Sequence, residues 1–164
     1  MNIVTQVTFA MLQHEHGNAH RINHFLRVYG YAKTIANAEQ VDHDTLRVIE
    51  VVALMHDIGI KVSMQKYNSG AWNYQQLEGP AEARAILVNL PCDSALMERI
   101  EWLIAHHHET TDVVGMDYQI LLEADYLVNA IDRKTPADEV WAGAEKFFKT
   151  ASGWQILKHL LGKD

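Results

Sequence analysis

Residues 51–59 read VVALMHDIG, and the rest of the chain is best understood from these positions. A run of apolar residues leads directly into His56 and Asp57, so two strongly polar side chains continue a hydrophobic segment. Burying such groups costs free energy unless a partner compensates, and a bound divalent metal ion is the simplest partner. Imidazole and carboxylate ligands together suit manganese, iron, zinc, cobalt or nickel, whereas an all-oxygen set would favour calcium or magnesium.

Helical spacing places two more polar residues on faces that are otherwise apolar. His24 shares a stripe with Val28 and Ile35, and Asp125 follows Leu121 by four positions. A single inward histidine or aspartate is usually a hydrogen-bonded core residue. Four such residues in one chain indicate a metal site instead.

Apolar residues recur along the whole chain at intervals of three and four, with almost no strict alternation. The sequence therefore predicts an all-α fold, a compact helical bundle that forms a single domain over residues 1–164. We expect the metal-binding core over about residues 18–132 and C-terminal packing helices over about residues 136–162. A chain of this length buries a hydrophobic core without disulfides or a structural metal, so a bound metal is expected to be functional.

Capping residues and helix breakers predict where the helices begin and end. We expect helices over residues 4–14, from Asn18 through Ile35, from Asp42 or Asp44 through His56, from Asp93 to the histidines at 106–108, and from about 117 to 132. Residues 61–72 are predicted to form a loop. Gly79-Pro80 predicts a helix start that runs until Pro91, and residues 135–138 predict a capping box with Pro136 at the first helical position.

The composition excludes several classes of protein. Hydrophobic residues make up 48% and charged residues 21%, with a formal net charge of -7, which excludes disorder and disfavours a general nucleic-acid or anionic-membrane surface. Cys92 is the only cysteine, so no internal disulfide can form, as is typical of a reducing compartment. The first residues lack a basic leader, and no stretch reaches the roughly 20 apolar residues of a membrane span. We therefore expect a cytoplasmic protein.

The order of His24, His56-Asp57 and Asp125 resembles the pattern of the HD-domain superfamily of metal-dependent phosphohydrolases. The three local contexts are HFLRV at 24–28, ALMHDIG at 53–59 and EADYL at 123–127, and the resemblance covers most of the chain. It implies a helical core in which these four residues hold one divalent ion. It also implies that Asp57 both binds the ion and orients or deprotonates the attacking water.

Two cations are candidates for binding the substrate's phosphate. Arg27 lies three residues after His24, and Lys61 lies four after Asp57, where each side chain could reach the mouth of the site. The alternative for both is an ordinary surface charge. Nearby, Trp72 and other aromatic residues of the expected loop could form a lid, stack on a base, or pack beneath the loop.

Residues 104–109 read IAHHHE and bear on the number of metal ions. Continuing the apolar stripe brings His107 inward, with His108 at the edge and His106 mostly away. His107 is therefore a candidate second-metal ligand, or a catalytic residue that donates a proton to the leaving group. Multi-metal members of the superfamily usually place another histidine in the segment where this chain has Gln75 and Glu78, which favours one ion over two.

These observations predict an enzyme, a phosphohydrolase that cleaves a phosphomonoester by metal-activated water, with nucleotides among its candidate substrates. Two alternatives stay open. A di-iron oxygenase on the same fold would need a second metal site, and a metal-stabilised regulatory or binding domain would have no turnover. The expected partner is a small phosphate-bearing molecule rather than nucleic acid or membrane, and a homodimer is open.

Overall fold

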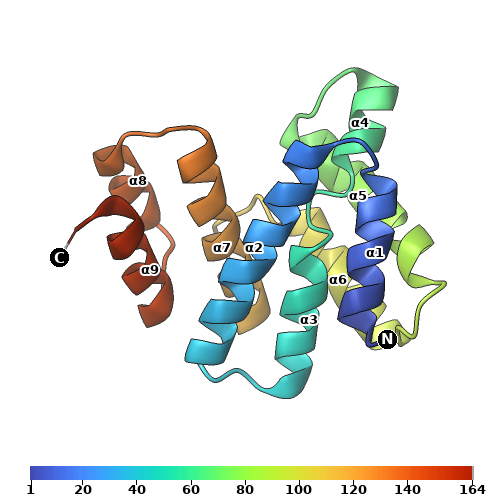
Figure 1. The fold of residues 1–164 in the computed structure, drawn as a ribbon, viewed down its shortest axis with the longest axis horizontal. Coiled ribbons are helices and arrows are strands. Elements are labelled where there is room, and N and C mark those ends of the chain that lie inside the picture. The colour runs from blue at the N-terminus through green and yellow to red at the C-terminus, as the bar shows by residue number, and fades with distance from the viewer. Residues whose placement is uncertain (164) are drawn as a thin grey trace.

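The computed structural model describes residues 1–163, and every regular element in them is an α-helix (Figure 1). The all-α prediction is confirmed. The helices follow one another in the order α1 (Ile3–His14), α2 (Ala19–Ala38), α3 (His43–Ala53), α4 (Ile60–Tyr67), α5 (Trp72–Leu87), α6 (Ser94–His106), α7 (Met116–Asp132), α8 (Ala137–Ala144) and α9 (Ala151–Leu161).

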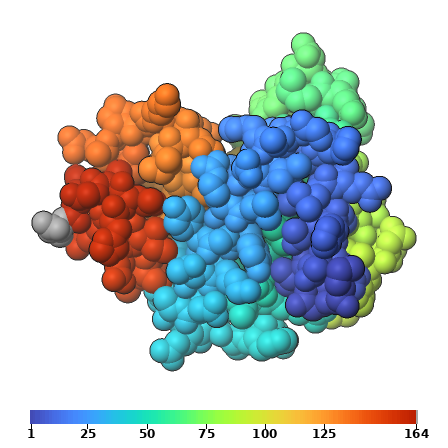
Figure 2. Space-filling view, viewed as in Figure 1, coloured from blue at the N-terminus to red at the C-terminus, as the bar shows by residue number. Residues whose placement is uncertain are grey.

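The body of the molecule is formed by α2, α3, α5, α6 and α7. Helix α2 packs against α3 and α7, α3 also packs against α6 and α7, and α5 packs against α6. Figure 2 shows α1 and α2 covering one face, with the C-terminal helices as a mass at one end. The core between these helices contains fully buried side chains from each of α2, α3, α6 and α7, among them Phe25, Ile49, Ile100 and Leu121.

Three of the predicted helix N-caps are present. The Asn18 side chain accepts a hydrogen bond from the backbone N–H of Arg21, and the side chains of Asp42 and Asp93 cap α3 and α6 in the same way. Each cap satisfies a backbone donor that the first turn of a helix leaves without a partner. The caps therefore fix the starts of α2, α3 and α6.

The predicted helix through His56 is too long. Helix α3 ends at Ala53, and residues 54–59 form consecutive turns. His56 and Asp57 therefore lie in a turn rather than on a helix face. The apolar spacing continues past the helix end because the turn is also buried, so the pattern could not show where the helix stopped.

The loop predicted over residues 61–72 is wrong, because α4 occupies most of it. Helix α4 ends at Tyr67, and its C-cap Asn68 has a left-handed φ of 51°. Asparagine tolerates this conformation better than most residues, so it serves as a helix terminator. Residues 68–71 form the connection to α5.

One predicted helix start, one predicted stop and one predicted cap are also wrong. Pro80 lies inside α5 rather than in its first turn, and α5 ends at Leu87, before Pro91. A Cβ atom on Gly79 would lie 2.5 Å from Ile104 Cγ2, so this glycine allows α5 to pack closely on α6 and does not mark a helix start. Helix α8 begins at Ala137 after Pro136, and its start has no side-chain cap, so the capping box does not form.

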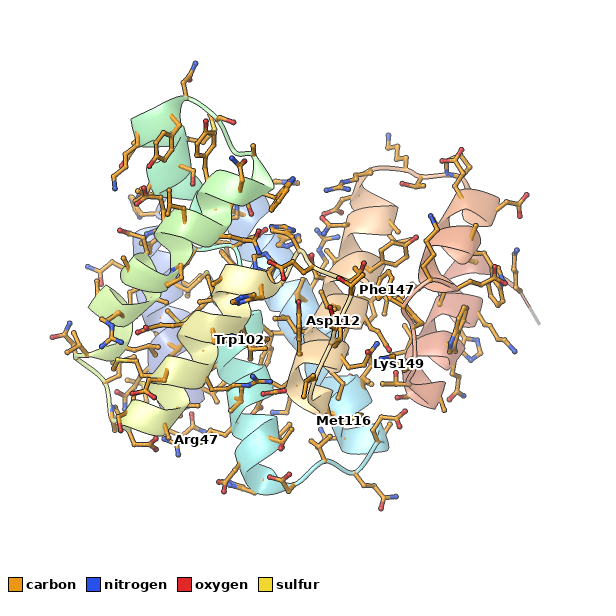
Figure 3. All side chains as sticks on the ribbon, turned by 180° about the vertical axis from the view of Figure 1, so that it is seen from behind. Arg47, Trp102, Asp112, Met116, Phe147 and Lys149 are labelled. Atoms are coloured by element: carbon orange, nitrogen blue, oxygen red, sulfur yellow. The ribbon has the colours of Figure 1, made fainter. Side chains whose placement is uncertain are left out.

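The C-terminal helices are joined to α7 by Glu123, which is completely buried. Its carboxylate accepts hydrogen bonds from Gln119 Nε2 and Lys149 N, both at 2.7 Å, and from both the backbone N–H and the hydroxyl of Thr150. Figure 3 shows Phe147 and Lys149 in the connection between α8 and α9, next to α7. One side chain of α7 therefore fixes the start of α9.

Within residues 1–163, no helix combines the length and apolar character needed to cross a membrane.

Candidate metal centre

His24, His56 and Asp125 meet in the interior, although they come from distant parts of the chain. His24 projects from α2, His56 from the turn after α3, and Asp125 from α7. The Nε2 atoms of the two histidines are 3.2 Å apart, and Asp125 Oδ1 lies 3.2 Å from His24 Nε2 and 3.4 Å from His56 Nε2. All three residues are buried. The packing of α2 and α7 on α3 creates this cluster.

Asp57 completes the cluster from the same turn as His56. Its Oδ2 atom lies 3.5 Å from His24 Nε2 and 3.7 Å from His56 Nε2. On a helix, neighbouring side chains point about 100° apart. The turn therefore does what a helix could not, because it directs both side chains of the His-Asp pair to one point.

The spacing of these atoms fits a single metal ion. Ligand atoms about 2.1 Å from a tetrahedral ion lie roughly 3.4 Å from one another. The Nε2 atoms of His24 and His56 lie 3.2 Å from each other and 3.2 to 3.7 Å from the nearer carboxylate oxygens of Asp57 and Asp125. Two imidazoles and two carboxylates also form a donor set suited to a divalent transition metal.

Hydrogen bonds hold the ligand groups in orientation. His56 Nδ1 donates to the backbone carbonyl of Ala53 at 3.0 Å, which leaves Nε2 directed at the centre. Asn129 Nδ2 donates to Asp125 Oδ1 at 2.8 Å, one turn further along α7. Such outer contacts fix the tautomer and orientation of metal ligands.

The charges of the Asp57 and Asp125 carboxylates favour a positive charge at the centre of the cluster. Burial lowers the pKa of His56, but the charges of Asp57 and Asp125 outweigh burial and raise this pKa to about 9. Burial raises the pKa of both carboxyls, but the nearby imidazoles outweigh burial and hold both pKa values below their usual range. The imidazoles beside Asp57 are those of His56 and His107. Those beside Asp125 are His24 and His56. Both carboxylates are therefore ionised at neutral pH.

A second group of potential ligands lies beside the first. His107 is buried, its Nδ1 donates to the carbonyl of Ile104 at 2.8 Å, and its Nε2 lies 3.2 Å from Asp57 Oδ1. Ligand atoms of Asp57, His107 and His108 lie within 4.8 Å of one another. The two oxygens of Asp57 thus face different histidine groups, a geometry that allows the carboxylate to bridge two ions.

The histidine triplet is oriented as the apolar stripe predicts. His107 points inward and His108 lies at the edge, whereas His106 stacks on Trp102 with ring centroids 4.2 Å apart. His108 Nε2 lies 2.9 Å from Gln75 Oε1. Burial and the neighbouring His107 lower the pKa of His108 to about 4, so its imidazole is neutral near pH 7.

The contact between Gln75 and His108 was not predicted from the sequence. Gln75 lies in the segment where a histidine was expected for a multi-metal site, and the structure brings it to His108 and to the hollow above the metal ligands. Glu78, the other residue considered there, binds Lys66 and Tyr67 instead, at 2.6 Å each.

The structure does not bring Arg27 or Lys61 to the metal ligands. Arg27 makes two hydrogen bonds to Asp132, at 2.7 and 2.6 Å, and Lys61 Nζ donates to the backbone carbonyl of His14. The site opens toward the first turn of α2. Arg21, one turn before His24, therefore faces the opening, whereas Arg27, one turn after His24, does not. Arg21 Nη1 lies 3.8 Å from Asp57 Oδ2.

The opening is a polar hollow of about 310 Å³, which we name the metal-centre hollow. Its lining includes His24, Asp57, Arg21 and Asn129, together with Arg133 at the end of α7. Sequence reasoning missed both arginines, because the direction in which the site opens depends on packing. Arg21 could have been considered from its spacing to His24, which mirrors that of Arg27.

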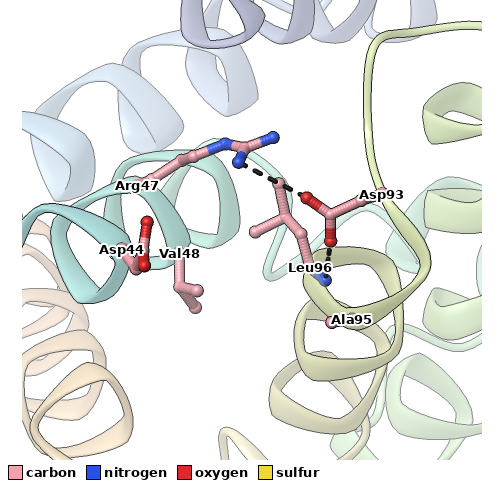
Figure 4. Close-up of a pocket in the computed structure, with 6 residues that line it drawn as sticks. All are labelled: Asp44, Arg47, Val48, Asp93, Ala95 and Leu96. Atoms are coloured by element: carbon pink, nitrogen blue, oxygen red, sulfur yellow. Dashed lines mark hydrogen bonds and ion pairs between the residues drawn. The ribbon is translucent and has the colours of Figure 1, made fainter.

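A different hollow, of about 280 Å³, lies between α3 and the start of α6 (Figure 4). Arg47 and Asp93 form an ion pair across it at 3.4 Å, and Asp93 also caps α6. It shares no lining residue with the metal-centre hollow. We therefore assign it no part in the chemistry.

Comparison with known proteins supports the family assignment. The chain is similar to a predicted HD superfamily hydrolase from an uncultured Thermotogales bacterium, whose crystal structure matches with a TM-score of 0.66 at 21% sequence identity, covering 95% of this chain and 82% of that one. A search of curated proteins finds no match. The sequence model of the HD domain matches residues 21–135, which include all four metal-ligand candidates. The chain therefore belongs to the HD-domain family.

Proposed function

We propose that this protein is a metal-dependent phosphohydrolase that cleaves a phosphomonoester. The observation that carries the proposal is the position of Arg21 and Arg133, which line the same hollow as His24 and Asp57. Guanidinium groups bind phosphate through paired hydrogen bonds. A phosphate group can therefore contact the arginines and the metal ligands at once.

The residues of the hollow have separable roles in this reaction. A divalent ion bound by His24, His56, Asp57 and Asp125 would lower the pKa of a bound water molecule and offset negative charge on the phosphate. Asp57 is a poor proton acceptor, because its neighbours hold its pKa low. We assign Asp57 to binding the metal ion and orienting the attacking water. We assign His107, whose Nε2 lies 3.2 Å from Asp57 Oδ1, to proton transfer to the leaving group.

One ion is the simpler arrangement for this reaction. The first group supplies two imidazoles and two carboxylates, whereas His107 and His108 share Asp57 with it, and His108 Nε2 lies beside the Gln75 amide. The second group is nevertheless the specific observation that favours the alternative, a di-iron oxygenase. A regulatory domain without turnover is less well supported, because the arginine-lined hollow remains accessible at the metal ligands.

Metal analysis and a substrate screen test the proposal together. The purified protein would be loaded with manganese, cobalt, nickel or iron, its ions per chain measured, and phosphate release followed with a panel of phosphomonoesters. About one ion and metal-dependent phosphate release support the proposal. Two irons without phosphate release would favour the oxygenase. An Asp57→Ala variant that retained full activity would refute the assigned site.

The expected partners and location remain predictions. A small phosphate-bearing substrate is part of the proposal, without general nucleic-acid or membrane binding. A homodimer and a cytoplasmic location would be checked by light scattering and by cell fractionation.

A further inference from the structure

A second hollow, of about 290 Å³, adjoins the metal-centre hollow on the side of α4. It is lined by Glu15 and its neighbours before α2, by Arg21, and by residues of α4 that include Ile60 and Lys61. Figure 1 shows the start of α2 and helix α4 at the same end of the molecule. We name this space the α4 hollow. Because it shares Arg21 and Ile60 with the metal-centre hollow, one ligand can reach into both.

Arg21 is the cation that the two hollows share. Its side chain is 21% exposed, and within residues 1–163 its only ion pair is the 3.8 Å contact between Nη1 and Asp57 Oδ2. The guanidinium makes no hydrogen bond to another described residue, since only the backbone N–H of Arg21 donates one. A guanidinium carries several N–H donors in a planar fork. Arg21 therefore has donors available toward each hollow.

Lys61 supplies a second cation on the α4 side of the α4 hollow. Its Nζ donates a hydrogen bond to the backbone carbonyl of His14, which fixes the position of the ammonium group. No carboxylate within residues 1–163 forms an ion pair with it, whereas Lys66, on the same helix, pairs with Glu78 at 2.6 Å. An ammonium group has three N–H donors. Lys61 therefore keeps donors for a ligand.

The carboxylate that lines the α4 hollow, that of Glu15, is already bound within the protein. Its Oε1 lies 3.1 Å from His14 Nδ1, and its Oε2 accepts a hydrogen bond from Asn18 Nδ2 at 3.4 Å. Arg21 and Lys61 outnumber it, so the lining carries a net positive charge, although the formal net charge of the chain is -7. A hollow whose charge is opposite to that of the chain attracts anions to one place.

We propose that the substrate carries a second anionic group, a phosphate or a carboxylate, which binds between Arg21 and Lys61 in the α4 hollow. The phosphate that is cleaved lies at the metal ligands. Both cations bind such groups through charge-assisted hydrogen bonds. Hydrolysis consumes one water molecule and releases inorganic phosphate and an alcohol, and the alcohol keeps the second anionic group. Lys61 thus contacts the leaving group and not the cleaved phosphate.

This inference rests on the proposed phosphohydrolase function and names a chemical feature of its substrate. Two matched pairs of substrates test it. Glycerol 3-phosphate and 3-phosphoglycerate differ by one carboxylate, and fructose 6-phosphate and fructose 1,6-bisphosphate differ by one phosphate. In at least one pair, kcat/KM of the wild type should be higher for the member with the second anionic group. The pair that shows this preference identifies the anion.

Variants at Lys61 connect the preference to the α4 hollow. The kcat/KM ratio within that pair should fall about ten- to a hundred-fold in Lys61→Met, and it should persist in Lys61→Arg, which keeps the charge. Lys158→Met, on the exposed side of α9, should leave the ratio unchanged, because Lys158 lines neither hollow. A general loss of activity cancels from the ratio, since both members are measured with the same variant.

A binding measurement separates this inference from the proposed function. Phosphonates are not hydrolysed at their carbon–phosphorus bond by a phosphatase, so their affinity for the manganese-loaded protein can be measured by calorimetry. The compounds are butylphosphonate, 4-phosphonobutyrate, which adds a carboxylate, and propane-1,3-bisphosphonate, which adds a phosphonate. At least one of the two compounds with a second anionic group should bind Lys61→Met about ten- to a hundred-fold more weakly than wild type. Butylphosphonate should bind both proteins equally, and circular dichroism would confirm that the variant is folded.

The outcomes distinguish the two claims. Phosphate release without any preference in the wild type, or with the same preference in Lys61→Met, would overturn the inference and leave the phosphohydrolase intact. Binding of a second anionic group that depends on Lys61, without phosphate release from any of the substrates, would support the α4 hollow and refute the phosphohydrolase.

Discussion

Replacing Gly59 with alanine tests how the turn that carries His56 and Asp57 is held in place. A Cβ atom at this position would lie 2.6 Å from the carbonyl oxygen of Gln75 and 2.7 Å from Gly79 N, both backbone atoms of α5. The φ of -71° is one that alanine adopts easily, so the cost is steric and not conformational. The two segments must separate to admit the methyl group.

The size of the effect follows from two opposing contributions. Overpacking against a rigid backbone costs about 3 kcal/mol. Removing glycine from the unfolded chain returns about 0.7 kcal/mol, which leaves a net loss of roughly 2 kcal/mol. For a chain of this length we expect Tm to fall by about 4–8 °C. Displacement of Asp57 should also weaken metal binding, so added metal should raise Tm less than in the wild type.

Thermal unfolding followed by circular dichroism, with and without manganese, provides the measurement. Gly30→Ala is the matched control, because Gly30 lies in α2 and a Cβ atom there meets nothing within 4 Å. This control should gain about 0.5–1 kcal/mol, since alanine is the better helix former. If Gly59→Ala unfolded at or above the wild-type temperature, the close approach of the turn to α5 would not be what positions Asp57.

The remaining predictions concern the buried hydrogen bonds of Glu123, the phosphate contacts and the dependence of stability on pH. Glu123→Ala should lower the free energy of unfolding by about 3 kcal/mol or more, because it leaves buried donors without an acceptor; a loss below about 1 kcal/mol in urea unfolding would contradict this. Arg133→Ala should raise KM for a phosphomonoester about tenfold, whereas Arg84→Ala, paired with Glu101 elsewhere, should not; equal effects would remove Arg133 from the phosphate site. His14 lies between Glu15, Glu82 and Lys61, and its hydrogen bond to Glu15 raises its pKa above 6.5. The stabilisation that protonated His14 provides should therefore be complete below pH 6.5 and disappear as pH rises through the folded-state pKa. The Tm difference between wild type and His14→Gln should shrink over that range. A constant difference would show that protonation of His14 does not stabilise the fold.

The parts of the fold that depend on nearby residues could be predicted from sequence. Asn18, Asp42 and Asp93 cap helices through backbone groups two or three positions away, so their roles are visible in a short window. The inward positions of His24 and Asp125 likewise follow from spacing along single helices. Such interactions are set before the helices pack together.

Other features could not be predicted, because they arise only when helices meet. The apolar run around residues 51–58 stays buried through both a helix and a turn, so its pattern does not show that α3 ends at Ala53. Arg21 and Arg27 are equally spaced from His24, and only the packing of α2 against α7 places the opening on the side of Arg21. The same packing brings Arg133 into the site.

The buried contacts of Glu123 have a consequence for where this protein can be shortened. The HD domain match ends at residue 135, but the backbone N–H groups of Lys149 and Thr150 donate hydrogen bonds to the Glu123 carboxylate, two positions before Asp125. A chain cut at residue 135 would expose the apolar side of α7 and leave Glu123 solvated in place of its native partners. The segment that the HD domain model matches is thus shorter than the set of residues packed around α7, and the last helices make hydrogen bonds to the helix that carries Asp125.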